Sequence, residues 1–441
     1  MADARADRQH LTRAVTELGR RRPVVVASAI YNTRGVKVID AGVTVDERLY
    51  ERLMQHPLAA PIEDSVRAEP GVNAALLRER ALALAERQPL FARMLAPAIR
   101  RDRLLAALDS VPLPPPIALQ LTLLLELHPA QFEHALACAL TAAWLGDEAL
   151  VTRHELAQLA AAGLLHDLGM LHVDPVLLQP AVPLQREQRR QLYAHPLVSA
   201  MLLERHHEFP HDVVRAVLEH HEALDGSGYP RHLAGDAIGP WGRIVALAEL
   251  VSARHALPSA RFEARLSLQL RLNRGRYDTA LVQRLHRLLG GRGADGGAPP
   301  RAASIERLCA LQAALGEWPA ELADAALFTA ERRRTIAEVS DRCGEVLRSM
   351  ADAGVAPPQL EMLEAVGGDG GDALELALLA DEAAWQLRMV GRLARRRWRA
   401  ASGEAFPPAL QQWLERTDAA VVATDAPAAG QDIGEPVAAA R

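Results

Sequence analysis

The spacing of the histidines is the feature that most constrains the fold of this chain. Thirteen of the sixteen histidines lie in the segment 128–255, which is about a third of the sequence. Within it, His134, His166, His195 and His220 follow one another at intervals of 32, 29 and 25 residues. Each interval is about one helical hairpin, so consecutive helices can each bring a side chain to a shared centre. The pattern predicts a helical bundle with metal or acid–base chemistry at its core.

The candidate ligands at these spacings are histidines and two carboxylates: His134, His166, Asp167, His195, His220, His221 and Glu249. His221 follows Val214 and Leu218 at helical spacing and should face the interior. Glu249 interrupts an apolar run, and a buried carboxylate is unfavourable unless it is paired or bound to a cation. Any single interior histidine is more simply read as a core residue; the joint pattern argues for metal. Iron, manganese or zinc would suit such a shell, and two ions about 3.5–4 Å apart can act on a phosphoryl group.

Composition limits the classes of function. The net charge is −5, so no global basic field recruits nucleic acid. The three cysteines are scattered without a CxxC pair, which argues against a cysteine-based zinc site and fits a reducing compartment. The polar N-terminus does not resemble a signal peptide, and the apolar stretch 135–146 is too short to span a bilayer. These features predict a soluble cytoplasmic protein.

The pattern along the chain predicts a mainly α protein with a small β-containing N-terminal module and a helical C-terminal region. A β-type run at 24–30, a turn at 32–35 and a second run at 36–39 form the β hairpin of that module. Thr152 and Glu155 form a capping box that opens the helix leading to His166. The expected boundaries are a module at 1–65, a helical connector at 66–116, a metal-binding helical domain at 117–290, a linker at 291–300, a helical region at 301–421 and a disordered tail at 422–441.

Several strings resemble the motifs of the HD-GYP family, a branch of the HD phosphohydrolases. They are HHEALDGSGYP at 220–230, LLHDLG at 164–169, HP at 195–196 and RIVALAE at 243–249, and they cover about residues 117–290. The resemblance implies an HD-type helical bundle that hydrolyses the bacterial messenger cyclic di-GMP to pGpG or GMP. By motif position it implies the metal ligands already listed and a catalytic pair, His166 and Asp167, with Asp167 bridging the metals. It places Asp225, Gly228, Tyr229, Pro230 and Arg231 on the substrate side.

The sequence departs from the family pattern at four positions. Met170 stands where the family has a lysine that would meet a phosphate, and methionine cannot donate a charge-assisted hydrogen bond. Glu249 replaces the final aspartate, and Ser199 replaces a glycine. The glutamate that adds a third metal in some members falls at Ala130, so two divalent ions are expected, iron or manganese in preference to zinc.

These departures leave alternatives open. The chain could be a degenerate regulatory module that binds metal, nucleotide or a signalling partner without efficient turnover. It could also be an HD phosphohydrolase acting on another phosphate ester or nucleotide. The candidate partners are cyclic di-GMP or a related nucleotide, a diguanylate cyclase or other signalling protein, and a second copy of the chain.

Overall fold

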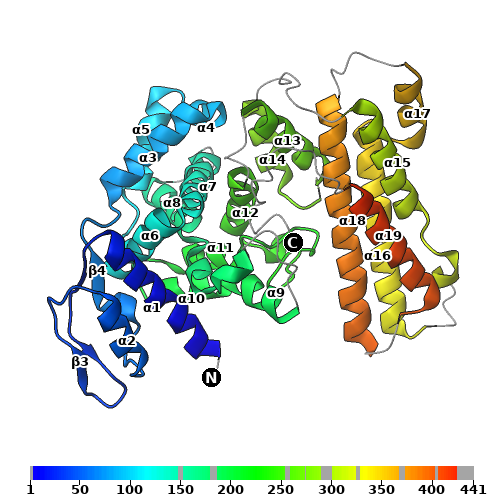
Figure 1. Ribbon diagram of the computed structural model, residues 1–441. Coiled ribbons are helices and arrows are strands. Elements are labelled where there is room, and N and C mark those ends of the chain that lie inside the picture. Colours follow the sequence, from blue (N-terminus) through cyan, green and yellow to red (C-terminus); the bar gives the residue numbers. More distant parts are fainter. Residues whose placement is uncertain are drawn as a thin grey trace. The chain divides into compact units, whose positions relative to one another are not determined.

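The computed structural model describes residues 3–147, 152–178, 186–253, 259–273, 275–289, 300–323, 328–366, 373–402 and 406–424. It is mainly α, which confirms the predicted fold class (Figure 1). The chain divides into two compact units, one holding residues up to Ser259 together with Gly275–Leu289, the other holding Ala260–Arg274 and the described residues beyond 290. Within the described ranges, no helix has both the length and the apolar character needed to cross a bilayer. The domain boundaries expected from the sequence remain a prediction.

The first unit begins with helix α1 (Asp3–Arg21) and four short strands. Strands β2 (Ile30–Tyr31) and β3 (Lys37–Ile39) form the expected antiparallel hairpin. Strand β1 (Val24–Val26) pairs instead with β4 (Val66–Ala68), just beyond the boundary expected at residue 65. Between β3 and β4 in the chain lie α2 (Glu47–Met54), which Asp46 caps, and the 3₁₀ turn η1 (Ile62–Asp64). The N-terminal module is therefore closed by a strand from outside the predicted hairpin.

The segment 66–116 contains three helices rather than one continuous helix. They are α3 (Ala74–Arg87), α4 (Pro89–Met94) and α5 (Ala98–Asp109), and helix α6 (Pro115–Leu127) follows. Proline begins α4 and α6 because its fixed φ suits the first turn, where its missing N–H costs no helical hydrogen bond.

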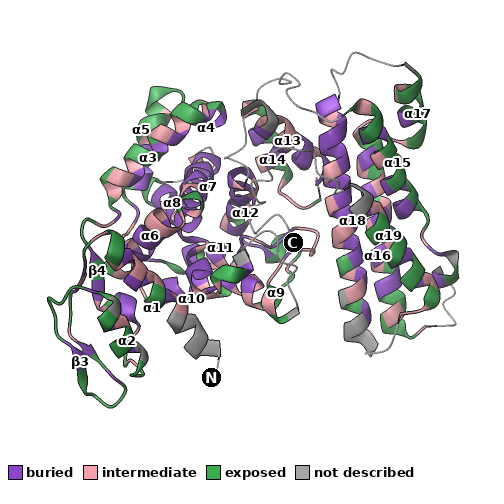
Figure 2. Ribbon diagram, viewed as in Figure 1, coloured by how far each residue is buried: buried purple, intermediate pink, exposed green. Residues whose placement is uncertain are grey.

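The described part of the first unit continues with seven helices, five of which position the candidate ligands. They are α7 (Pro129–Asp147), α8 (Arg153–Leu165), α9 (Arg186–Tyr193), α10 (His195–Glu204), α11 (His211–Glu219), α12 (Pro240–Ser252) and α14 (Thr279–Leu288), with 3₁₀ turns η2 (Leu168–His172), η3 (Pro175–Leu178) and η4 (Gly235–Ala237). Helices α7 and α12 are buried along most of their length (Figure 2). The capping box of Thr152 and Glu155 is present and begins α8, as predicted.

Helices α7 and α8 approach each other unusually closely at one glycine. A Cβ atom added at Gly163 would lie 2.8 Å from the Cα atom of Ala139, so no side chain fits between the two backbones. This contact lies one turn before His166 on α8 and one turn after His134 on α7. The close packing therefore brings the first two predicted ligands together.

The second unit is a separate helical bundle. It contains α13 (Ser259–Leu272), α15 (Arg301–Gly316), η5 (Ala320–Ala323), α16 (Ala330–Asp352), α17 (Pro357–Val366), α18 (Ala373–Ser402) and α19 (Pro408–Thr424). Its core includes the buried rings of Trp398 and Trp413. The predicted linker falls outside the described residues apart from residue 300. The predicted tail does too, except that residues 422–424 continue α19 and are helical rather than disordered.

Candidate metal centre

The same local hydrogen bond orients the rings of three of the predicted ligands. The Nδ1 atoms of His166, His195 and His220 lie 2.8, 2.7 and 2.5 Å from the carbonyl oxygens three residues earlier in the chain, those of Gly163, Leu192 and Val217. Each carbonyl accepts an Nδ1–H, and in the neutral form of the ring this leaves Nε2 as an unprotonated donor atom. The rings sit at helix ends, where the backbone carbonyl or the turn of the chain places them beside the bundle interior.

Asp167 lies between two groups of imidazole nitrogens. Its Oδ1 is 3.1 Å from Nε2 of His195 and 3.5 Å from Nε2 of His220. Its Oδ2 is 3.5 Å from Nε2 of His166 and 3.7 Å from Nε2 of His134. The two oxygens of one carboxylate thus face two different sets of donors, as a bridging ligand would.

Glu249 completes one of these two groups. Its Oε2 lies 2.9 Å from Nε2 of His134 and 3.1 Å from Nε2 of His166. His221 belongs to the other group, with Asp167, His195 and His220. The structure therefore brings together all seven predicted ligands, on α7, α8, α10, α11 and α12 and the turns that follow them. Their role as ligands remains a prediction.

The arrangement fits divalent cations. Nε2 of His134 and Nε2 of His166 are 3.2 Å apart, and those of His195 and His220 are 3.3 Å apart. In the second pair both Nδ1 atoms already face carbonyls, so two neutral rings would direct two lone pairs at each other. Asp167 Oδ1 and both Glu249 oxygens are buried without a hydrogen-bond donor among the described residues. A shared cation satisfies such lone pairs, and imidazole with carboxylate is a donor set that binds divalent metals.

The pKa shifts reflect the close contact between the carboxylates and the imidazole rings. Burial alone would raise the pKa of Asp167, but the His166 and His195 rings hold it well below its usual value. The pKa of Glu249 is likewise well below its usual value, because the His134 and His166 rings outweigh the effect of burial. Burial lowers the pKa of His220 and, with the neighbouring rings, that of His221. Although burial opposes the effect, Glu249 raises the pKa of His134 and Asp167 holds the pKa of His166 well above its usual value, so these two rings must release a proton before they bind a metal ion.

The GYP loop, residues 226–230, packs directly on the histidine pair. A Cβ atom at Gly228 would lie 2.4 Å from Cα of Glu222 and 2.5 Å from the carbonyl oxygen of His221, so only glycine fits. The Tyr229 ring stacks on the His221 ring at a centroid distance of 4.6 Å, and the backbone N–H of Tyr229 donates a hydrogen bond to the His221 carbonyl over 3.0 Å. Pro230 follows it directly. Gly228 and Tyr229 therefore form a wall beside the predicted ligands.

Two other predicted substrate-side residues are engaged within the protein. The Asp225 carboxylate accepts hydrogen bonds from the backbone N–H and the hydroxyl of Ser227, at 2.9 and 2.6 Å. The Arg231 guanidinium donates to Glu219 over 2.9 Å. The sequence argument did not identify Glu219, although it directly precedes the histidine pair.

Glu222, also unrecognised from the sequence, holds the end of the same loop. Its two carboxylate oxygens accept the backbone N–H groups of Arg231 and Leu233, at 2.7 and 2.9 Å. Its side chain is buried. The helical period and the HHE string could have pointed to Glu219 and Glu222 as interior carboxylates, but not to their backbone partners.

Two of the departures from the family pattern have structural roles. Met170 is 7% exposed and belongs to a small apolar cluster with Val173, Leu177 and Leu192. Ser199 is fully buried, and its hydroxyl accepts the backbone N–H of Gly169 over 2.8 Å. The serine thus ties the turn after Asp167 to helix α10, a contact that the sequence does not reveal.

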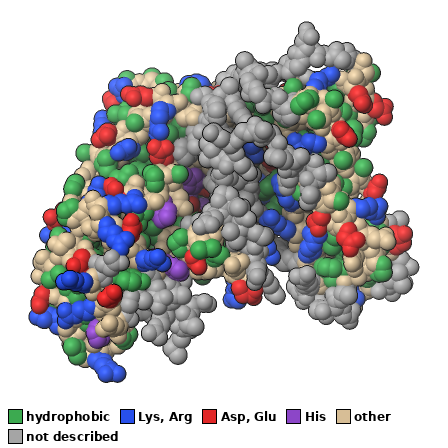
Figure 3. Space-filling view, viewed as in Figure 1, with side chains coloured by type: hydrophobic (Ala, Val, Ile, Leu, Met, Phe, Trp, Pro, Cys, Tyr) green, Lys and Arg blue, Asp and Glu red, His purple; other side chains and the backbone are tan. Residues whose placement is uncertain are grey.

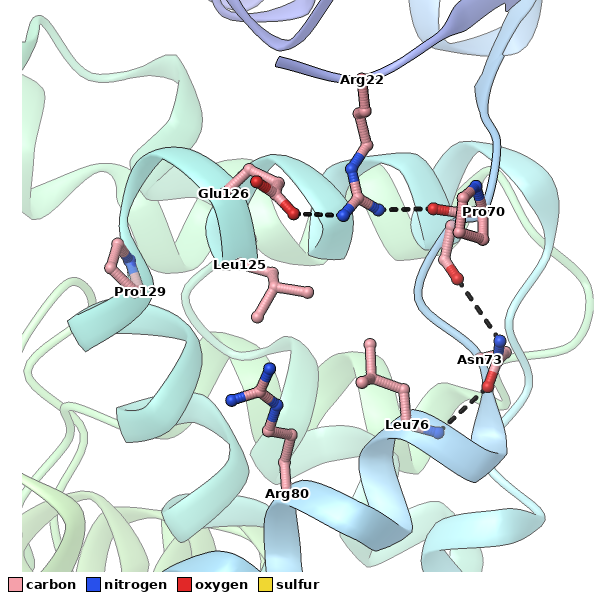
Figure 4. A pocket seen from close by; sticks show the side chains of 9 residues that line it. Arg22, Pro70, Asn73, Leu76, Arg80, Leu125, Glu126 and Pro129 are labelled. Atoms are coloured by element: carbon pink, nitrogen blue, oxygen red, sulfur yellow. Dashed lines mark hydrogen bonds and ion pairs between the residues drawn. The ribbon is translucent and has the colours of Figure 1, made fainter.

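A cavity of about 420 Å³ lies elsewhere in the first unit, between the loop after β4 and the end of α6. Arg22, Leu76, Arg80 and Glu126 are among its lining residues, and Arg22 pairs with Glu126 and with the Pro70 carbonyl (Figure 4). None of its lining residues belongs to the metal centre. Among the described side chains on the face seen in Figure 3, acidic and basic groups are interspersed.

Comparison with known proteins identifies the segment that contains this centre. Residues 120–281 match the model of the HD domain family. The chain is 36% identical over 98 residues to 3'3'-cGAMP-specific phosphodiesterase 3 of Vibrio cholerae, covering 22% of this chain and 21% of that protein. It is 35% identical over 130 residues to a cyclic di-GMP phosphodiesterase of the same organism, covering 27% and 26%.

A third relative, from Xanthomonas campestris, is the cyclic di-GMP phosphodiesterase response regulator RpfG. The identity is 35% over 144 residues, which cover 31% of this chain and 38% of that protein. The chain thus spans between about a fifth and two fifths of the length of these relatives. Together these matches show that residues 120–281 form a domain of the HD family, similar in sequence to cyclic-dinucleotide phosphodiesterases.

Proposed function

We propose that this chain is a metal-dependent phosphodiesterase that hydrolyses cyclic di-GMP to pGpG or GMP and acts in the cytoplasm. The observation that supports it most directly is the position of Asp167, whose two oxygens face separate sets of imidazole nitrogens at 3.1–3.7 Å. A carboxylate in this position suits a pair of ions. Two relatives are named as cyclic di-GMP phosphodiesterases and one as a 3'3'-cGAMP-specific enzyme, which supports a cyclic dinucleotide as the substrate.

The residues of the chain would have distinct tasks in this reaction. His134, His166 and Glu249 would hold one divalent ion, and His195, His220 and His221 the other, with Asp167 shared. Bound divalent ions supply Lewis-acid activation of water and of a phosphoryl oxygen.

The GYP loop would form the substrate side of this centre. The Tyr229 ring, stacked on His221, fixes that wall, and Gly228 lets the loop pack closely against it. Iron or manganese remain the expected ions for the imidazole and carboxylate donors.

One pair of observations favours the regulatory alternative. The Met170 side chain packs among apolar residues, and the Arg231 guanidinium is paired with Glu219. Position 170 and Arg231, both expected on the substrate side, therefore offer no unpaired cation in this structure. A module with the centre intact and weak turnover would bind the nucleotide or a signalling protein, and a diguanylate cyclase or a second copy are the candidate partners.

Metal analysis combined with a substrate panel tests the proposal. The full-length chain is purified with and without air, its iron, manganese and zinc are measured per chain, and it is assayed with cyclic di-GMP, 3'3'-cGAMP, linear pGpG and simple nucleoside phosphates. We expect about two ions per chain and fastest turnover of cyclic di-GMP. Two bound ions without turnover would favour the regulatory module, and faster hydrolysis of the linear substrates would favour a different phosphohydrolase.

A matched pair of aspartate variants locates the activity. Asp167→Asn keeps the shape of the side chain but removes its charge, whereas Asp102→Asn alters a surface carboxylate that is 70% exposed. Loss of groups that only support metal ligands already lowers affinity or activity about 10- to 100-fold, so we expect Asp167→Asn to lower turnover by more than about 100-fold. The Asp102 variant should behave as the wild type. Equal activity in both variants would place the centre elsewhere.

A further inference from the structure

The centre contains a donor that the sequence argument set aside. Cys138 lies on α7 four residues after His134, so the two side chains share one face of the helix. Its sulfur, a ring nitrogen of His166 and a carboxylate oxygen of Glu249 all lie within 4.8 Å of one another. All three side chains are buried, and Cys138 and His166 are 0% exposed.

The surroundings of Cys138 differ from those of an ordinary core cysteine. A buried cysteine usually behaves as a small apolar residue among apolar atoms. Here the sulfur lies within 4.8 Å of an imidazole nitrogen and of a carboxylate whose two oxygens have no hydrogen-bond donor among the described residues. A thiol is only a weak donor and carries a single proton, so it leaves these buried lone pairs largely unsatisfied. A cation among the three groups would satisfy all of them.

The distances are compatible with one shared ion. Bonds from a divalent ion to sulfur and nitrogen are about 2.3 and 2.0–2.1 Å long, which places two donors of one ion up to about 4.4 Å apart. Donor atoms within 4.8 Å of one another reach this range with shifts of a few tenths of an ångström. Nε2 of His134 lies 2.9 Å from Oε2 of Glu249.

We propose that Cys138 is a ligand of the ion held by His134, His166 and Glu249. This inference rests on the proposed metal centre and adds a thiolate to its donor set. On binding, the thiol releases its proton to solvent as the sulfur–metal bond forms. Because thiolate is a soft ligand, this half of the centre should prefer zinc or cobalt to manganese, whereas the His195, His220 and His221 half has only nitrogen and oxygen donors.

Cobalt substitution tests the ligand directly, without relying on activity. The full-length chain is prepared with Cys309→Ser, which removes the exposed cysteine, then stripped of metal and titrated with Co²⁺. A cobalt–thiolate bond gives charge-transfer absorption in the near ultraviolet, whereas imidazole and carboxylate ligands give only weaker bands in the visible. We expect the ultraviolet band to saturate with one Co²⁺ per chain.

Adding Cys138→Ala should abolish the ultraviolet band while cobalt still binds at the centre, with its affinity at that half lowered by more than about tenfold. Cys343→Ala is the matched control, since Cys343 is a buried cysteine in the core of the second unit and should leave the band intact. Cys138→Ser should also lack the band. Because serine is nearly isosteric with cysteine, this variant tests the ligand even if the alanine variant misfolds.

The outcomes separate this inference from the function on which it rests. Cobalt bound at the histidines without the ultraviolet band, or a band that survives Cys138→Ala, would overturn the cysteine ligand and leave the proposed metal centre standing. No cobalt binding at all would overturn both.

Discussion

Removal of the Glu219 carboxylate should loosen the loop beside the proposed metal centre. Glu219 is fully buried, and its oxygens accept hydrogen bonds from Nε of Arg215 at 2.8 Å, Nη2 of Arg231 at 2.9 Å and the backbone N–H of Gly239 at 2.8 Å. One side chain therefore ties α11, the segment after the GYP loop and the start of α12 together. Glu219→Ala breaks all three contacts.

The size of the stability loss depends on how exposed the hydrogen-bond partners of Glu219 are to water. Hydrogen bonds to charged groups contribute about 1.5–3 kcal/mol each, so the simple sum for three is about 4.5–9 kcal/mol. The side chains of Arg215 and Arg231 are 39% and 45% exposed, and both can regain water when Glu219 is lost. We therefore expect a local loss of about 2–4 kcal/mol, most of it from the stranded Gly239 amide and the space left by the side chain.

Hydrogen exchange measured by mass spectrometry suits this prediction, because two separate units complicate a single unfolding curve. At 1.4 kcal/mol per factor of ten, amides in the segment 226–239 should exchange about 30- to 700-fold faster in Glu219→Ala. Glu79→Ala, on the exposed face of α3, is the control and should change nothing measurable. Unchanged protection of 226–239 in Glu219→Ala would refute the view that this carboxylate holds the loop.

Three further perturbations follow from the same unit. Burial, with help from Arg205, lowers the pKa of His172 to about 4 in the folded protein, below its unfolded value near 6.5. The folded state is therefore not penalised by this histidine above pH 6.5, but it loses stability as the pH falls from 6.5 toward 4, by about 2 kcal/mol between pH 7 and 5. Thermal melts of His172→Gln should show a shallower pH dependence than those of the wild type. Gly169→Ala should destabilise the unit by about 1–3 kcal/mol or more, because its Cβ would lie 2.3 Å from the His195 carbonyl oxygen, whereas Gly275→Ala meets nothing within 4 Å; equal melting temperatures for the two variants would contradict this. Met170→Lys should lower stability without raising kcat/KM, since the lysine would enter an apolar cluster, and a gain in kcat/KM would show that the side chain reaches the substrate instead.

The sequence by itself determined the helical class and the candidate ligands, because both are written in short-range patterns. Histidines at hairpin spacing and the HHEALDGSGYP string lead to the same seven side chains that the structure brings together. The Thr152 and Glu155 capping box was equally readable, since its two partners are three residues apart. Helical periodicity and local motifs can be recognised in the sequence because the chain itself fixes the distance between their residues.

Tertiary structure decided what depends on residues far apart in the chain. The pairing of β1 with β4, across about forty residues, could not be inferred from a hairpin signal. Cys138 looked like one of three unrelated cysteines until α7, α8 and α12 placed it beside His166 and Glu249. The resemblance placed position 170 and Arg231 on the substrate side, but Met170 packs in an apolar cluster and Arg231 is paired with the buried Glu219 carboxylate. A sequence pattern indicates which face of a helix a residue occupies. It does not indicate which other helix packs against that face, and this packing determines the surroundings of the side chain.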